Sequence, residues 1–125
     1  DEMEKTRIES EFFAMDDGEK LHFLAENTPE HFDLFSVYLL ELKERRELEL
    51  MKDLAKKVSK KFGDDLELYL HVAIFFMDED PNIAKSYLAK ALSKVERLEG
   101  AQEQEKRSLE IKIKKLIRGC DRKNK

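Results

Sequence analysis

The sequence is poor in the residues that end or bend secondary structure. Its 125 residues include four glycines and two prolines. A β-sandwich or β-barrel needs a turn roughly every 8–12 residues, and so few glycines and prolines cannot supply those turns. The long stretches without either residue therefore predict an all-helical protein.

Cysteine and long apolar runs are also scarce. Cys120 is the one cysteine, so no disulfide can form within the chain, and a disulfide-stapled secreted domain is not supported. No apolar run reaches the roughly 18 residues of a membrane span. We expect a cytoplasmic location, although a single cysteine says little about the compartment. The chain begins with Asp1 rather than Met, which predicts a piece of a longer or processed protein.

Charge is abundant but unevenly distributed. Charged residues make up 42% of the chain and apolar residues 41%, a balance typical of soluble helical proteins with charged outer faces. From residue 106 to 125 nine basic and two acidic residues give a charge of +7. Since the net charge is −4, the other residues carry −11. Six basic residues near the C-terminus form what we call the basic patch: Lys112, Lys114, Lys115, Arg118, Arg122 and Lys123.

The basic C-terminal segment is predicted to be a helix that ends near Arg118, followed by a disordered basic tail over residues 119–125. The alternation of apolar residues around Ile113 would also fit an edge strand, but the rest of the chain offers no partner strand. Repulsion among these charges predicts a nearby acidic group on this protein, on a partner, on RNA or on anionic lipid. No aromatic residue in the segment could stack on bases, which weakens the case for nucleic acid.

Capping residues predict several helix boundaries. Thr28–Pro29 and Asp80–Pro81 each combine an N-cap residue with proline at the first helical position. Gly63 predicts a helix C-terminus, with Asp64 and Asp65 as the cap of the next helix. The apolar stripe stops at Arg45 and Arg46, which predicts a turn near residues 44–48 between two antiparallel helices, although one long helix over 29–62 is the alternative.

Two neighbouring helical pairs have the same apolar spacing. The buried stripe predicted for the helix after Pro81 falls, after a shift of 33 residues, on the stripe predicted for the helix before Gly63. The two stripes are Ala84, Leu88, Ala91, Val95 and Met51, Ala55, Val58, Phe62. A period in the low thirties is the length of a helix–turn–helix unit that stacks on its neighbours. The predicted units span about 32–64 and 65–98, within a single helical domain of residues 1–118.

The unit over 65–98 resembles a tetratricopeptide repeat. In the second helix of that family a small, a bulky apolar and a small residue recur at spacings of four and three, as Ala84, Leu88 and Ala91 do here. The chain departs from the family at His71 and Glu96, where leucine and proline are usual. The resemblance implies a short α-solenoid of stacked antiparallel hairpins with a basic helix at its C-terminus.

The resemblance also implies a concave groove lined by the first helix of each unit. Its residues here would be Tyr69, Ala73, Phe76, Met77, Val37 and Leu40. The alternative is that these residues belong to the core. Family members that grip the acidic C-termini of chaperones place Lys, Asn and Arg in the groove, and that set is missing here.

No pattern for catalysis, a metal or a cofactor is complete in this sequence. Glu19–His22 has the Glu-x-x-His spacing of di-iron bundles, but such a site needs a second copy and two further carboxylates. The segment 78–82 begins like a calcium loop, but Ile83 and Ala89 stand where glycine and glutamate are needed. Basic neighbours predict a lowered pKa for the Cys120 thiol. We expect no enzyme, no metal and no cofactor.

The function expected from these features is a non-enzymatic scaffold that binds a peptide or helix of another protein. One alternative is binding of nucleic acid or an anionic surface through the basic C-terminal helix. Another is a closed helical bundle that serves as a structural or regulatory domain of a larger protein.

Overall fold

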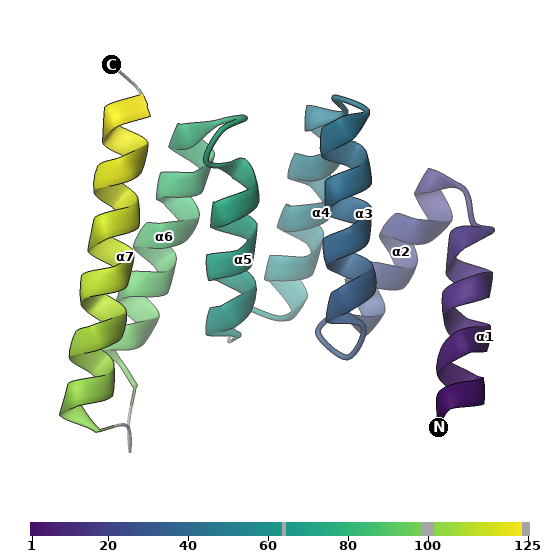
Figure 1. The fold of residues 1–125 in the computed structure, drawn as a ribbon, viewed down its shortest axis with the longest axis horizontal. Helices are drawn as coiled ribbons and strands as arrows, with labels where there is room; N and C mark the ends of the chain where they lie inside the picture. Colours follow the sequence, from purple (N-terminus) through teal and green to yellow (C-terminus); the bar gives the residue numbers. More distant parts are fainter. Residues whose placement is uncertain (64, 99–101, 124–125) are drawn as a thin grey trace. The chain divides into compact units, whose positions relative to one another are not determined.

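A computed structural model describes residues 1–63, 65–98 and 102–123 of the chain (Figure 1). These residues form helices and no strand, which confirms the all-helical prediction. The helices are α1 (Glu2–Phe13), α2 (Asp17–Asn27), α3 (Phe32–Glu44), α4 (Leu48–Lys61), α5 (Leu66–Phe76), α6 (Pro81–Glu96) and α7 (Glu103–Lys123).

The chain divides into two compact units. The N-terminal unit, Asp1–Phe62, holds α1 to α4, and the C-terminal unit, Gly63–Lys125, holds α5 to α7. The single domain expected for residues 1–118 stays a prediction.

In the N-terminal unit α4 packs against both α2 and α3. The buried stripe of α3 includes Phe35, Leu39 and Leu42, none of which is exposed. Phe12 joins α1 to this core, because its ring centroid lies 5.7 Å from that of Phe23 and 6.0 Å from that of Tyr38. Each fully buried side chain of this size contributes about 1.5–3 kcal/mol through removal of apolar surface from water.

In the C-terminal unit α6 lies between α5 and α7 (Figure 1). Its buried stripe is the predicted one: Ala84, Leu88, Ala91 and Val95. Small side chains at two of these positions allow neighbouring helices to approach α6 closely. Ile113 and Cys120 are the buried residues of α7.

Several predicted boundaries are confirmed. Arg46 adopts a positive φ of 60° between α3 and α4, a backbone conformation that a helix cannot continue through. The turn expected near residues 44–48 therefore separates two helices. Asp65 caps α5 by accepting a hydrogen bond from the Leu68 amide at 3.1 Å. Asp80 caps α6 in the same way, with Pro81 in the first turn.

Two predicted boundaries are wrong. Thr28 is not an N-cap but the C-cap of α2, because its amide donates to the Leu24 carbonyl at 3.1 Å and so completes the last turn of that helix. The next helix begins only at Phe32. The predicted disordered tail is also wrong over residues 119–123, which belong to α7 because burial of Cys120 fixes its last turns. Residues 64, 124 and 125 lie outside the described residues.

Candidate functional site

Three of the predicted groove residues lie in the core of the C-terminal unit. Tyr69 is 7% exposed, and Ala73 and Phe76 are completely buried. The ring of Tyr87 on α6 lies 5.9 Å from Tyr69 and 6.5 Å from Phe76, between ring centroids. These side chains therefore pack between α5 and α6, and the prediction that they line an open groove is wrong. Periodicity could not separate the two readings, because both place the residues on an apolar face.

Met77 is also partly covered. It is the C-cap of α5 and is half-buried. A Cβ added to Gly119 would lie 3.4 Å from the Met77 Cε atom, so the Met77 side chain lies against α7.

Val37 and Leu40 are the groove residues that remain on the surface. Both are on α3, and each is 48% exposed. Asp33 and Glu44, also exposed, occupy the same helix face one turn before and one turn after them. The α3 face, as we call Asp33, Val37, Leu40 and Glu44, is thus an apolar pair between two carboxylates. Lys5 of α1 reaches Asp33 at 4.0 Å.

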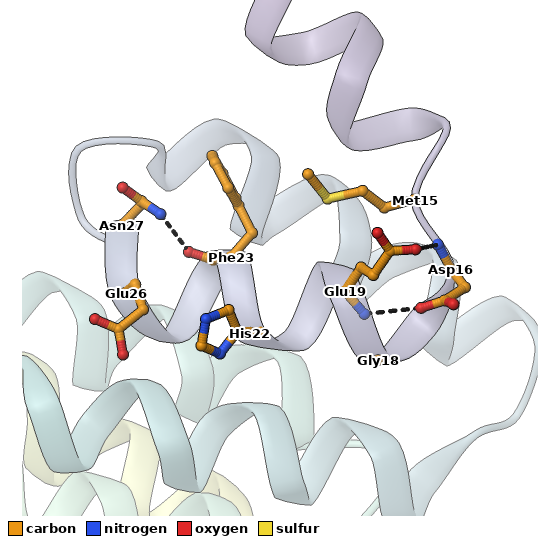
Figure 2. Close-up of a pocket in the computed structure, with 8 residues that line it drawn as sticks. All are labelled: Met15, Asp16, Gly18, Glu19, His22, Phe23, Glu26 and Asn27. Carbon is orange, nitrogen blue, oxygen red and sulfur yellow. Dashed lines mark hydrogen bonds between the residues drawn. The ribbon is translucent and has the colours of Figure 1, made fainter.

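A hollow of about 610 Å³ runs along α2 in the N-terminal unit (Figure 2). No pattern in the sequence indicates this hollow, since its residues come from one helix and the turn before it. They are Met15, Asp16, Gly18, Glu19, His22, Phe23, Glu26 and Asn27.

The polar groups of this hollow bond mainly to their own helix or to α4. Asp16 accepts from the Glu19 amide at 2.8 Å, and the Asp16 amide donates to the Glu19 carboxylate at 3.3 Å, which completes a capping box (Figure 2). Asn27 donates to the Phe23 carbonyl at 2.8 Å. Glu26 forms an ion pair with Lys61 of α4. No nucleophile is paired with a base among these lining residues.

The most developed polar cluster lies between α2 and α3. Arg45 donates two hydrogen bonds to the Asp17 carboxylate, at 3.0 and 2.8 Å, and the Tyr38 hydroxyl donates a third at 2.6 Å. These bonds hold the pKa of Asp17 far below its ordinary value. Burial, followed by the bond to Asp17, raises the pKa of Tyr38.

A buried lysine completes this cluster. The Lys20 ammonium lies 3.7 Å from the Glu41 carboxylate and over the rings of Phe12 and Tyr38, at 5.6 and 5.3 Å from their centroids. Its residue is only 8% exposed. The cluster thus satisfies its own charges and fastens α2 to α3. Asp17 is 21 and 28 residues from its partners Tyr38 and Arg45, so no local pattern predicts it.

All six residues of the basic patch are exposed on α7. Lys123 forms an ion pair with Asp78, and Lys85 of α6 forms another with Asp121 at 2.6 Å. Both pairs fasten the last turns of α7 to the rest of the C-terminal unit. The predicted lowering of the Cys120 pKa is wrong, because burial of the thiol and the charge of Asp121 raise the pKa and outweigh the lowering by Lys123 and Lys85.

The described ranges contain no group of three or more His, Cys, Asp and Glu residues placed to hold a metal ion. None of the described helices is long and apolar enough to cross a membrane. Comparison with protein-family models, with curated proteins and with solved structures found no match.

Proposed function

We propose that the protein is a non-enzymatic interaction module in which α3–α4 and α5–α6 stack as tetratricopeptide-like hairpins and bind a helix of another protein. Two similarities between the hairpins support this proposal. Each joins its helices by a turn of three or four residues. In each second helix, residues in equivalent positions are buried: Met51, Ala55 and Val58 in α4, and Ala84, Leu88 and Ala91 in α6.

The observation that carries the proposal is the exposure of Val37 and Leu40 on the first helix of a hairpin. Apolar area buried by a partner contributes about 25 cal/mol per Å², and both side chains are nearly half exposed. Because α5 buries its own groove residues, the binding surface is confined to the α3 face.

The carboxylates of the α3 face define the chemistry of the partner. Asp33 and Glu44 are eleven residues apart on the helix, a distance of about 16 Å. A partner helix with two apolar residues between basic ones would match both the apolar pair and these charges. Recognition of an amphipathic helix depends on apolar residues at i, i+3 or i+4.

The test is binding of synthetic amphipathic helical peptides to the full chain, measured by fluorescence anisotropy. One peptide set carries lysines on both sides of its apolar pair, and the other carries glutamates. We expect the lysine set to bind and the glutamate set to bind at least tenfold more weakly. Equal binding of the two peptide sets would contradict the proposal that the partner helix has basic residues on both sides of its apolar pair.

A matched pair of variants locates the surface. Leu40→Glu should weaken binding of the lysine peptide at least tenfold. Ile74→Glu should keep the affinity for the lysine peptide within twofold of that of the unaltered protein. Ile74 is 49% exposed on α5 but lies outside the α3 face. If Leu40→Glu binds as the unaltered protein does, while circular dichroism shows it folded, the α3 face is not the binding surface.

A further inference from the structure

The two sides of α7 differ sharply. Ile113 and Cys120 are buried on the side that packs against α6. On the opposite side, exposed residues follow each other at intervals of four, four, three and four: Arg107, Ile111, Lys115, Arg118 and Arg122. This spacing keeps them on one helical stripe. With the adjacent Lys114, the stripe forms a row of five cations about 22 Å long, which we call the α7 row.

Two acidic residues near the C-terminal end of α7 are already paired with other cations. Lys85 forms an ion pair with Asp121, and Lys123 forms one with Asp78. Within the described ranges, no carboxylate forms an ion pair with a cation of the α7 row. The five positive charges are therefore available to an external anion.

We propose that the α7 row binds the phosphate backbone of a nucleic-acid duplex without reading its base sequence. A duplex carries one negative charge per roughly 1.7 Å of its axis, so about 13 phosphates pass along the length of the row. Because α6 covers one side of α7, the helix meets the backbone from outside rather than entering a groove. Backbone contacts of this type give position and affinity but carry no direct sequence information.

Two other polyanions fit the surface less well. A helix that lies in a membrane interface inserts its apolar side, but the apolar side of α7 is packed against α6 and only Ile111 among its large apolar residues is exposed. Proteins that bind single strands stack bases on aromatic rings, and α7 has no aromatic residue. The surface thus has the charge but not the side chains that these two ligands require.

The test is anisotropy of labelled short DNA and RNA duplexes with the full chain, between about 50 and 200 mM salt. Five phosphate contacts predict that the logarithm of the association constant falls against the logarithm of salt concentration with a slope of about −4.5. The DNA and RNA arms show which duplex binds more tightly. A slope near zero, or no binding to either duplex at the lowest salt, would overturn the proposal.

A charge-matched pair of double variants tests the location. Lys115→Glu with Arg118→Glu should reduce the steepness of the slope by about 2 and weaken binding at least tenfold. Lys56→Glu with Lys60→Glu changes the net charge equally on α4, where both lysines are exposed, and should have a smaller effect on affinity and none on the slope. Equal losses of duplex affinity in the two double variants would mean that net charge alone drives binding, which contradicts the proposal.

Vesicles of phosphatidylcholine mixed with phosphatidylserine provide the remaining comparison. We expect them to bind more weakly than either duplex at the same salt concentration. Tighter binding to the vesicles would assign the α7 row to a lipid surface instead. Leu40→Glu should leave duplex binding unchanged, so this proposal and the proposed peptide binding fail independently.

Discussion

At the scale of single residues, Asp17 has the most consequential environment in the N-terminal unit. It accepts hydrogen bonds from Arg45 and Tyr38, and its side chain is 36% exposed. Solvent screening at this exposure limits what the pair contributes, but the geometry is bidentate and the third bond comes from a buried tyrosine. Asp17 therefore links α2 to α3 through these hydrogen bonds.

Asp17→Asn should lower the free energy of unfolding at neutral pH by about 1 kcal/mol. Its folded-state pKa lies below the ordinary value of 3.8, so the stabilisation is present above that value and is lost as the pH falls toward the folded pKa. The difference between variant and unaltered protein should therefore narrow in acid. Urea unfolding of both proteins, at neutral pH and at a pH well below 3.8, measures this difference in the free energy of unfolding.

Asp53→Asn is the control for this prediction. Asp53 pairs with Lys57 at 3.2 Å on the surface of α4, with similar exposure. An exposed pair at this spacing contributes about 0.3–0.5 kcal/mol. If both substitutions lower the free energy of unfolding equally at neutral pH, and both effects change equally in acid, the cluster at Asp17 has no special role.

Cys120 gives a second prediction at the residue scale. Its side chain is completely buried and burial raises its pKa, so both access and thiolate content are low. The folded protein should react with Ellman's reagent far more slowly than the protein in urea. Equal rates in the two conditions would mean that the last turns of α7 are open in solution.

At the scale of elements, α6 depends on small residues at its buried positions. Ala91→Leu should lower the free energy of unfolding by about 1–3 kcal/mol, because Ala91 is completely buried and the added atoms have no space. Ala89→Leu on the exposed side of the same helix should change it by less than about 0.5 kcal/mol. Thermal unfolding of the two variants measures the difference, and equal values would contradict the packing of α6.

Gly119 tests whether α7 continues beyond Arg118. A Cβ there would lie at ordinary contact distance, 3.4 Å, from the flexible end of Met77. Gly119→Ala should therefore stabilise the protein by about 0.5–1 kcal/mol through helix propensity. Gly119→Leu should destabilise it, because the larger side chain meets Met77. If residue 119 were in a disordered tail, neither substitution would change the unfolding midpoint.

The sequence predicts local elements better than it predicts the faces that stay exposed. The break at Arg45 and Arg46, the cap at Asp80 and the buried stripe of α6 depend on neighbouring residues, and all three are confirmed. Burial of Tyr69 and Phe76 depends on Tyr87 of another helix, which periodicity does not report.

The errors at Thr28 and in residues 119–123 have related causes. Thr28 is a good capping residue by type, but the chain uses it to end α2 rather than to begin α3. Residues 119–123 look like a charged tail, yet Cys120 supplies a buried contact that extends α7. The Asp17 cluster joins residues far apart in the chain and has no local signal at all.

At the scale of the whole molecule, the two proposed surfaces belong to different units and have opposite charge. The α3 face is bounded by carboxylates in the N-terminal unit, and the α7 row is basic in the C-terminal unit. A single chain with both surfaces would connect a basic helical partner to a polyanion.

A crystal structure of the full chain would test the proposed stacking of two consecutive hairpins as repeats. The measurement is the superposition of α3–α4 on α5–α6, together with the position of α5 relative to α3. We expect the hairpins to superpose helix for helix, with α3 and α5 side by side on one face and α4 and α6 on the other. Hairpins that do not superpose, or α3 and α5 on opposite faces, would contradict the proposed stacking.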